Sequence, residues 1–288
     1  MSLRTLLLAC AALASSAAAE PAPQPITLGE SYTVPSQVMS TERTINVYLP
    51  ADYAKDTKSY PVLYLIDGGV DQDFVHVVGA SVIGAASGRQ QDAIIVGIAT
   101  KDRRDELTRP TADPALLAKY PTAGHSERFR RFIRDEVKPL IAARYRTNGT
   151  DGVIGESLAG LFIAETWLRE PDLFGSYAAI SPSLWWDNAA LSAAASALAG
   201  KAQDGHRLMI ATAEEGAEEA GFDASFLTAL GPRREVCAVP HPEYTHATIY
   251  HAVVPAALQF LFPTPEKLDP QYGFTTGCPE PAAPGEGG

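Results

Sequence analysis

The sequence predicts an α/β fold in which a mostly parallel sheet is covered by helices on both faces. Short, nearly continuous apolar runs are typical of strands buried on both faces. They occur at residues 62–66, 93–98, 152–154, 177–180 and 208–211. Amphipathic stretches with helix-like spacing lie between them, at 127–144, 158–168, 189–198, 222–230 and 247–261. Strands that alternate with helices favour a parallel sheet, and 288 residues suffice for one large domain.

The remaining elements follow from local patterns. Residues 44–49 alternate apolar and polar side chains, which predicts a strand with one solvated face. Pro139 and Pro255 lie inside two of the helical stretches and predict a kink or a break in each. The polar stretch 100–124 predicts a long loop, which in a compact domain is typically a lid or a binding loop.

The N-terminus has the pattern of a secretory signal peptide. Arg4 precedes an apolar run over residues 6–14, and the small residues 17–19 predict cleavage after Ala19. We therefore expect a periplasmic or secreted protein with a leader over 20–40, the α/β domain over 41–265 and a tail over 266–288. No later segment approaches the ~20 apolar residues that a membrane-spanning helix needs.

Net charge and cysteine content limit the binding partners, cofactors and disulfides that the sequence predicts. The formal net charge of −11 argues against binding to nucleic acid or to an anionic membrane surface. No cysteine or histidine pair has the spacing of a metal site, and the chain is expected to need no metal or organic cofactor. Removal of the signal peptide takes Cys10 away, so Cys237 and Cys278 are predicted to form a disulfide in an oxidising compartment.

Residues 154–160, Ile-Gly-Glu-Ser-Leu-Ala-Gly, form the most informative motif of the chain. A serine between small residues, directly after a buried strand and before a helix, is typical of a nucleophile elbow. The usual pattern ends in glycine where this sequence has Ala159, followed by Gly160. The motif predicts Ser157 as a nucleophile at the carboxyl end of a parallel strand, where such sheets carry their sites.

A serine nucleophile needs a base, and an acid to orient that base. His246 follows the last apolar strand and begins the last helix, so it is the predicted base. Glu214, directly after the strand that ends near Ala213, is the predicted acid. The other candidates for the acid are Glu215, Glu218, Asp223, Glu243 and Asp187.

Further residues are predicted to bind the substrate. The Leu158 amide and the Gly69 amide, in the loop after another buried strand, are the predicted oxyanion donors. Trp185 and Trp186 are predicted to stack on the substrate. Arg104, with its neighbour Arg103, is the predicted contact for an anionic group.

Together these segments resemble the esterase branch of the α/β-hydrolases, which includes siderophore esterases, esterase D and the mycolyltransferases. The resemblance extends from about residue 60 to 263. It lies in residues 60–68, 105–110, 154–162, 181–186, 245–247 and 253–262. It implies an α/β-hydrolase fold, Ser157 as nucleophile, His246 as base and an acid after the strand ending near Ala213. Some siderophore-type members work with a Ser/His pair alone, so the acid is not essential to the resemblance.

The expected activity is hydrolysis of a small-molecule carboxylic ester through an acyl-enzyme. A siderophore-type ester and a hydrophobic carboxylic ester are both compatible with the predicted pocket. Two alternatives stay open, an acyltransferase on the same scaffold and an inactive protein that binds a ligand, because a fold does not determine a function.

Overall fold

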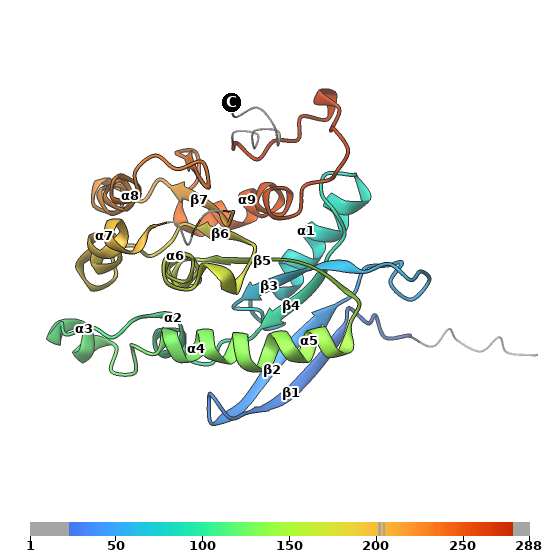
Figure 1. Cartoon of the computed structure of the whole chain (residues 1–288), viewed down its shortest axis with the longest axis horizontal. Coiled ribbons are helices and arrows are strands. Elements are labelled where there is room, and N and C mark those ends of the chain that lie inside the picture. The colour runs from blue at the N-terminus through green and yellow to red at the C-terminus, as the bar shows by residue number, and fades with distance from the viewer. Residues whose placement is uncertain (1–22, 201–202, 204, 279–288) are drawn as a thin grey trace, which may run out of the picture.

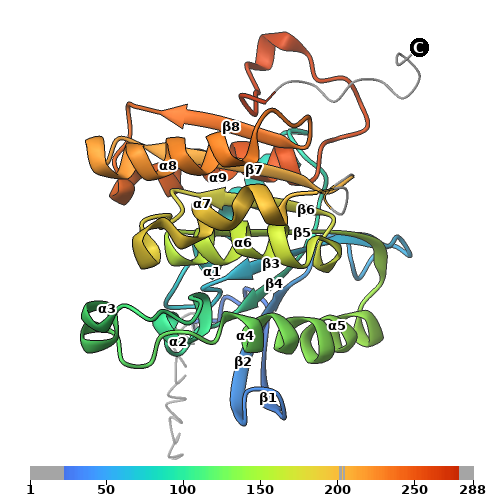
Figure 2. The same cartoon turned by 60° about the vertical axis from the view of Figure 1, so that its left-hand side comes forward.

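The computed structural model describes residues 23–200, 203 and 205–278, so the predicted signal peptide lies outside the described residues. Within these ranges the chain forms one sheet with the strand order β1-β2-β4-β3-β5-β6-β7-β8 (Figure 1 and Figure 2). β1 pairs antiparallel with β2, and β2 antiparallel with β4. All other pairs are parallel, which confirms the predicted sheet.

The strands have the following bounds: β1 Glu30–Ser36, β2 Thr41–Tyr48, β3 Tyr60–Ile66, β4 Ile94–Ile98, β5 Thr147–Glu156, β6 Ser176–Ile180, β7 Arg207–Ala213 and β8 Val236–His241. Every residue of β3, β4 and β6 is buried, as continuous apolar runs predict. β1 lies in the segment expected to be a leader, and it adds an edge strand to the sheet instead.

Helices cover both faces of the sheet (Figure 1). One face carries α1 (Phe74–Ala86) and α9 (His246–Leu261). The other carries α4 (Ser126–Phe132), α5 (Lys138–Arg144), α6 (Leu158–Arg169), α7 (Trp186–Leu198) and α8 (Ala217–Leu230). None of the helices in the described ranges is long and apolar enough to cross a bilayer.

The helix that follows the predicted nucleophile lies at the centre of the molecule. Residues 158–168 of α6 are all buried, including Trp167 and Phe162 with no exposed surface. The helix packs against β5 and β6 and has α2 and α7 beside it. Because so much apolar surface is removed from water along its length, the start of α6 is held rigidly.

Two helical predictions need refinement. The stretch 127–144 is interrupted by a π-helical turn, Ile133–Val137, which ends just before Pro139 becomes an early residue of α5. α9 runs unbroken through Pro255. α1 was not predicted, because its side chains Val75, Val82 and Ile83 are exposed and its sequence is apolar on every side.

The predicted long loop contains two short helices, α2 (Arg103–Leu107) and α3 (Pro114–Lys119). A buried ion pair attaches α2 to the sheet. The two terminal nitrogens of Arg43, in β2, lie 2.6 and 2.8 Å from the carboxylate oxygens of Glu106. Removing one partner of such a pair leaves an uncompensated buried charge, so this loop is fixed where it begins.

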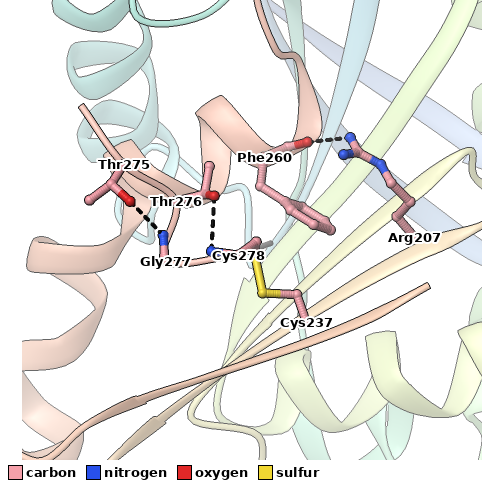
Figure 3. Close-up of a disulfide and its surroundings, with 7 residues drawn as sticks. All are labelled: Arg207, Cys237, Phe260, Thr275, Thr276, Gly277 and Cys278. Atoms are coloured by element: carbon pink, nitrogen blue, oxygen red, sulfur yellow. Dashed lines mark hydrogen bonds between the residues drawn. A yellow bond between two sulfur atoms is a disulfide. The ribbon is translucent and has the colours of Figure 1, made fainter. Parts of the chain in front are cut away.

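The C-terminal segment is fixed to the opposite edge of the sheet (Figure 3). A disulfide joins Cys278 to Cys237 in β8 across 41 residues of sequence. The Thr275 and Thr276 hydroxyls accept hydrogen bonds from the amides of Gly277 and Cys278, which shape the approach to the bridge.

Candidate active site

Three neighbouring strands end in residues with a left-handed backbone. Asp67, Ser157 and Ser181 follow β3, β5 and β6 and have φ values of 58°, 61° and 41°. Non-glycine residues rarely adopt positive φ, and such residues cluster at functional sites when the surrounding structure holds them there. This edge of the sheet is therefore the candidate active site.

Ser157 has the backbone of an elbow between β5 and α6, with φ 61° and ψ −118°. Its N–H donates to the carbonyl of Ile180 at 3.0 Å, and its own carbonyl accepts from the amide of Ser183 at 3.0 Å. The Ser157 Oγ lies 3.2 Å from the Ser183 Oγ. The loop after β6 thus holds both the backbone and the hydroxyl of Ser157.

Small residues surround the elbow because the chain segments are too close for larger ones. A Cβ atom on Gly155 would lie 2.6 Å from the Cβ of Ala159, and one on Gly160 would lie 3.0 Å from the carbonyl oxygen of Ile180. Ala159 fits because its neighbour Gly155 has no side chain. Alanine at position 159, where the usual pattern has glycine, is therefore compatible with the elbow.

His246 is the first residue of α9, whose start is fixed by a capping box between Thr245 and Thr248. Its Nδ1 lies 3.1 Å from Glu215 Oε1 and 2.9 Å from Ser181 Oγ, and the Ser181 hydroxyl also donates to Glu215. The hydrogen bond that His246 donates to Glu215 is the main cause that raises the pKa of His246. Burial opposes ionisation of Glu215, but its hydrogen bonds from His246 and Ser181 lower its pKa.

The residue that contacts His246 is Glu215, not Glu214. The Glu214 amide donates to the Tyr244 carbonyl at 2.8 Å, and the Glu214 carboxylate is exposed and accepts from the Gly216 amide. Consecutive side chains of an extended segment point to opposite sides. The backbone of Glu214 is bonded to the loop that carries His246. The side chain of the next residue, Glu215, is therefore the one that points toward the imidazole.

The other carboxylates considered for this role have different surroundings. Glu243 bonds to His241, and Asp187 accepts from Thr111. Glu218 is exposed, and burial together with the neighbouring Glu215 raises the pKa of Asp223 to about 7. None of these four has a hydrogen bond to His246 in the described part of the chain.

The two amides predicted to bind the oxyanion differ in whether their N–H groups already have an acceptor. The Leu158 N–H belongs to the first turn of α6, where an amide has no acceptor within the helix. The Gly69 N–H donates to Gln72 Oε1 at 2.9 Å, and Gln72 Nε2 donates to Thr100 Oγ1 at 3.0 Å. Gln72, which no pattern in the sequence singles out, therefore covers the amide that is predicted to face the substrate.

The predicted substrate-binding side chains lie farther along the same rim. Trp186 is buried against Tyr120, with ring centroids 5.9 Å apart, whereas Trp185 is half-buried. The Arg104 guanidinium lies 4.5 Å from the centre of the Tyr120 ring. It is the neighbouring Arg103 that reaches the elbow, where it donates to Asp67 at 2.9 Å and to the Glu156 carbonyl at 3.5 Å.

A cavity of about 260 Å³ opens beside the elbow and is lined by Asp67, Gln72, Asp73, Arg103 and Glu156. Burial raises the pKa of Glu156 to about 7 and that of Asp73 to about 6. Asp73 was not among the predicted site residues, and Glu156 was noted only as part of the elbow motif. The described residues hold no group of three or more histidine, cysteine or acidic side chains arranged for a metal ion.

Comparison with known proteins places the chain in a family. The family model described as "Putative esterase" matches residues 36–235, well over half of the chain. Two similar proteins of Bacillus subtilis are the uncharacterized protein YbbA and the ferri-bacillibactin esterase BesA. YbbA is 28% identical over 54% of this chain and 62% of its own length. BesA is 33% identical over 44% of this chain and 49% of its own length.

Among solved structures, the chain is similar to an IroE-like serine hydrolase from Shewanella oneidensis. The TM-score is 0.69 with 26% identity, and the match covers 81% of this chain and 80% of the other. The two Bacillus subtilis relatives, by contrast, are matched over only about half to three fifths of their own lengths. The extent of the family match and the observed sheet lead to one conclusion: the chain belongs to the putative esterase family and has the α/β-hydrolase fold.

Proposed function

We propose that this protein is a serine ester hydrolase in which Ser157 attacks the ester carbonyl carbon and His246 takes up the serine proton. The observation that carries the proposal is that the strained Ser157 elbow and the Glu215–His246 pair both contact the loop after β6. Ser157 contacts Ser183 in this loop, and His246 contacts Ser181. Membership of the esterase family supports ester hydrolysis as the reaction class.

The hydrogen bonds around His246 suit the role of a base. With Nδ1–H donating to Glu215, the other ring nitrogen, Nε2, is unprotonated and able to accept a proton. The Ser157 hydroxyl then turns from Ser183 toward Nε2 as its oxygen bonds to the carbonyl carbon. The resulting imidazolium is stabilised by the Glu215 carboxylate at 3.1 Å.

The tetrahedral intermediate carries a negative oxygen that needs hydrogen-bond donors. The Leu158 N–H, at the start of α6, is one donor, and the helix N-terminus adds a favourable dipole. Gly69 supplies the second once the substrate oxygen takes the place of Gln72 Oε1. The intermediate then loses the alcohol, which receives its proton from His246, and water later hydrolyses the acyl-serine.

The proposal also covers the location of the protein and the class of its substrate. The signal-peptide pattern supports export to the periplasm or the medium. The name of BesA, a ferri-bacillibactin esterase, suggests siderophore-type esters as one substrate class for this chain. A hydrophobic carboxylic ester is the other class that we propose to test.

A kinetic comparison of serine variants tests the proposal. Ser157→Ala should lower turnover of p-nitrophenyl acetate by ~10³-fold or more, because only binding and oxyanion stabilisation remain. Ser183→Ala is the matched control, since the backbone amide of Ser183 still bonds to Ser157 and the nucleophile is retained. Equal turnover by wild type and Ser157→Ala would refute the assignment. Product analysis with an added alcohol separates hydrolysis from acyl transfer.

A further inference from the structure

We infer that the cavity beside Ser157 is a subsite for a primary ammonium group of the substrate, held by the carboxylates of Asp73 and Glu156. The inference rests on the proposed function, because it takes the substrate to be an ester that reaches Ser157. It goes further in naming a charged group that this ester carries.

The lining of the cavity is entirely polar and has an excess of negative charge. Asp67, Asp73 and Glu156 face it, together with Gln72 and a single cation, Arg103. Arg103 is already paired with Asp67 at 2.9 Å, and Asp67 also accepts from the Thr100 hydroxyl. Among the described residues, the remaining two carboxylates, on Asp73 and Glu156, form no ion pair, although the charge of Arg103 acts on both of them from its place beside Asp67.

Polar atoms around the cavity lack hydrogen-bond partners. Glu156 Oε1 is buried without a donor, and Asp73 precedes α1 without capping it through its side chain. Tyr250 is not one of the lining residues, but the charges of Asp73, Glu156 and Asp67 act on it, and its hydroxyl is also buried and unpartnered in a residue that is 4% exposed. Buried polar groups without partners are uncommon, because each costs free energy that a hydrogen bond would recover.

The ionisable groups that surround these carboxylates do not outweigh the negative charge of the cavity. His246, which is paired with Glu215, acts on Glu156, and His251 acts weakly on Asp73 from α9. The carboxylates of Asp67 and Glu215 act on the same two groups with negative charge. A primary ammonium group offers three N–H donors and one positive charge, which match two carboxylates that lack donors. An anionic ligand, such as a ferric complex of several catecholates, would instead face like charge. The subsite thus narrows the substrate toward esters with an amine.

Ammonium binding should depend on pH through these same carboxylates. Burial raises the pKa of Glu156 to about 7 and that of Asp73 to about 6, so both are partly protonated near neutral pH. A cation binds the ionised forms, and its affinity should therefore rise between pH 5 and pH 8. Binding at pH 6.5 should release protons to the buffer, since it favours ionised carboxylates.

The test compares two ligands of the same shape, n-butylammonium and n-butanol, by isothermal titration calorimetry on the Ser157→Ala variant at pH 8. We expect n-butylammonium to bind at least about tenfold more tightly, as a charged hydrogen bond predicts. Asp73→Asn and Glu156→Gln should each reduce this preference by about tenfold. The preference should persist in Asp71→Asn, a control that removes an exposed carboxylate two residues away.

Equal affinity for the two ligands, tighter binding of n-butanol, or a preference unchanged in both cavity variants would overturn the inference. If neither variant folds, the preference of the Ser157→Ala protein itself is followed from pH 5 to pH 8, and a flat profile would overturn it as well. The measurement needs no turnover. Failure of the proposed function would instead appear as an inert wild-type enzyme, so the two failures are distinguishable.

Discussion

Replacing Glu215 by glutamine tests how this site prepares its base. Glu215 and His246 form a hydrogen bond of 3.1 Å, and their side chains are 25% and 44% exposed. A hydrogen bond to a charged group contributes about 1.5–3 kcal/mol, and each 1.36 kcal/mol of barrier is a factor of ten in rate. The substitution should thus lower kcat/KM by about 10- to 150-fold. Because the imidazole is nearly half-exposed, we expect the lower part of that range.

The assay is hydrolysis of p-nitrophenyl acetate across pH 5–9, with Glu214→Gln as the matched control. Glu215 raises the pKa of His246 above 6.5, and only the neutral imidazole acts as a base. The acidic limb of the wild-type profile should therefore lie above pH 6.5, and Glu215→Gln should move it to lower pH. Glu214→Gln should change neither rate nor profile. A large loss in Glu214→Gln with none in Glu215→Gln would refute the assignment of the acid.

Three further predictions follow from the contacts. Replacing Cys237 and Cys278 by serine should lower the free energy of unfolding in urea by up to about 4 kcal/mol, given the 41-residue separation; an unchanged midpoint would contradict this. Gly155→Ala places a Cβ 2.6 Å from that of Ala159, so both the thermal midpoint and turnover should fall, and a fully active variant would disprove the packing argument. Gln72→Ala should lower KM with little change in kcat, because it removes a competitor for the predicted oxyanion amide; a large loss of kcat would show instead that Gln72 holds the loop.

Much of the fold could be predicted from the sequence because buried parallel strands leave continuous apolar runs. β3, β4 and β6 are of this kind and coincide with the predicted strands. β1 is an edge strand in which only Ser36 is buried, so its sequence has little apolar pattern. α1 lacks a polar face, since it exposes Val75 and Ile83, and its periodicity is hidden for that reason.

Part of the candidate site could likewise be predicted from the sequence, and part of it could not. The positions of Ser157 and His246 follow from chain order, because each lies at the start of a helix that follows an apolar run in the sequence. The choice between Glu214 and Glu215 depends on which way two successive side chains point, and that direction is set by the contact of the Glu214 amide with Tyr244. No spacing rule encodes such a contact between distant loops.

The acidic cavity could not be predicted from the sequence for a related reason. Asp73 and Glu156 are far apart in the sequence, just before α1 and at the end of β5, and each resembles an ordinary carboxylate in its local context. Their proximity arises from the pairing of β3 with β5, which brings the ends of both strands to one edge. The raised pKa values then come from burial, a property of the assembled fold.

Reaction of the wild-type protein with a fluorophosphonate, followed by mass spectrometry of its peptides, tests the central claim most directly. Such a reagent forms a stable adduct with a serine only where a base and an oxyanion site activate the hydroxyl. We expect a single adduct on Ser157 that is absent from Ser157→Ala. No adduct, or an adduct on another serine that persists in Ser157→Ala, would contradict it.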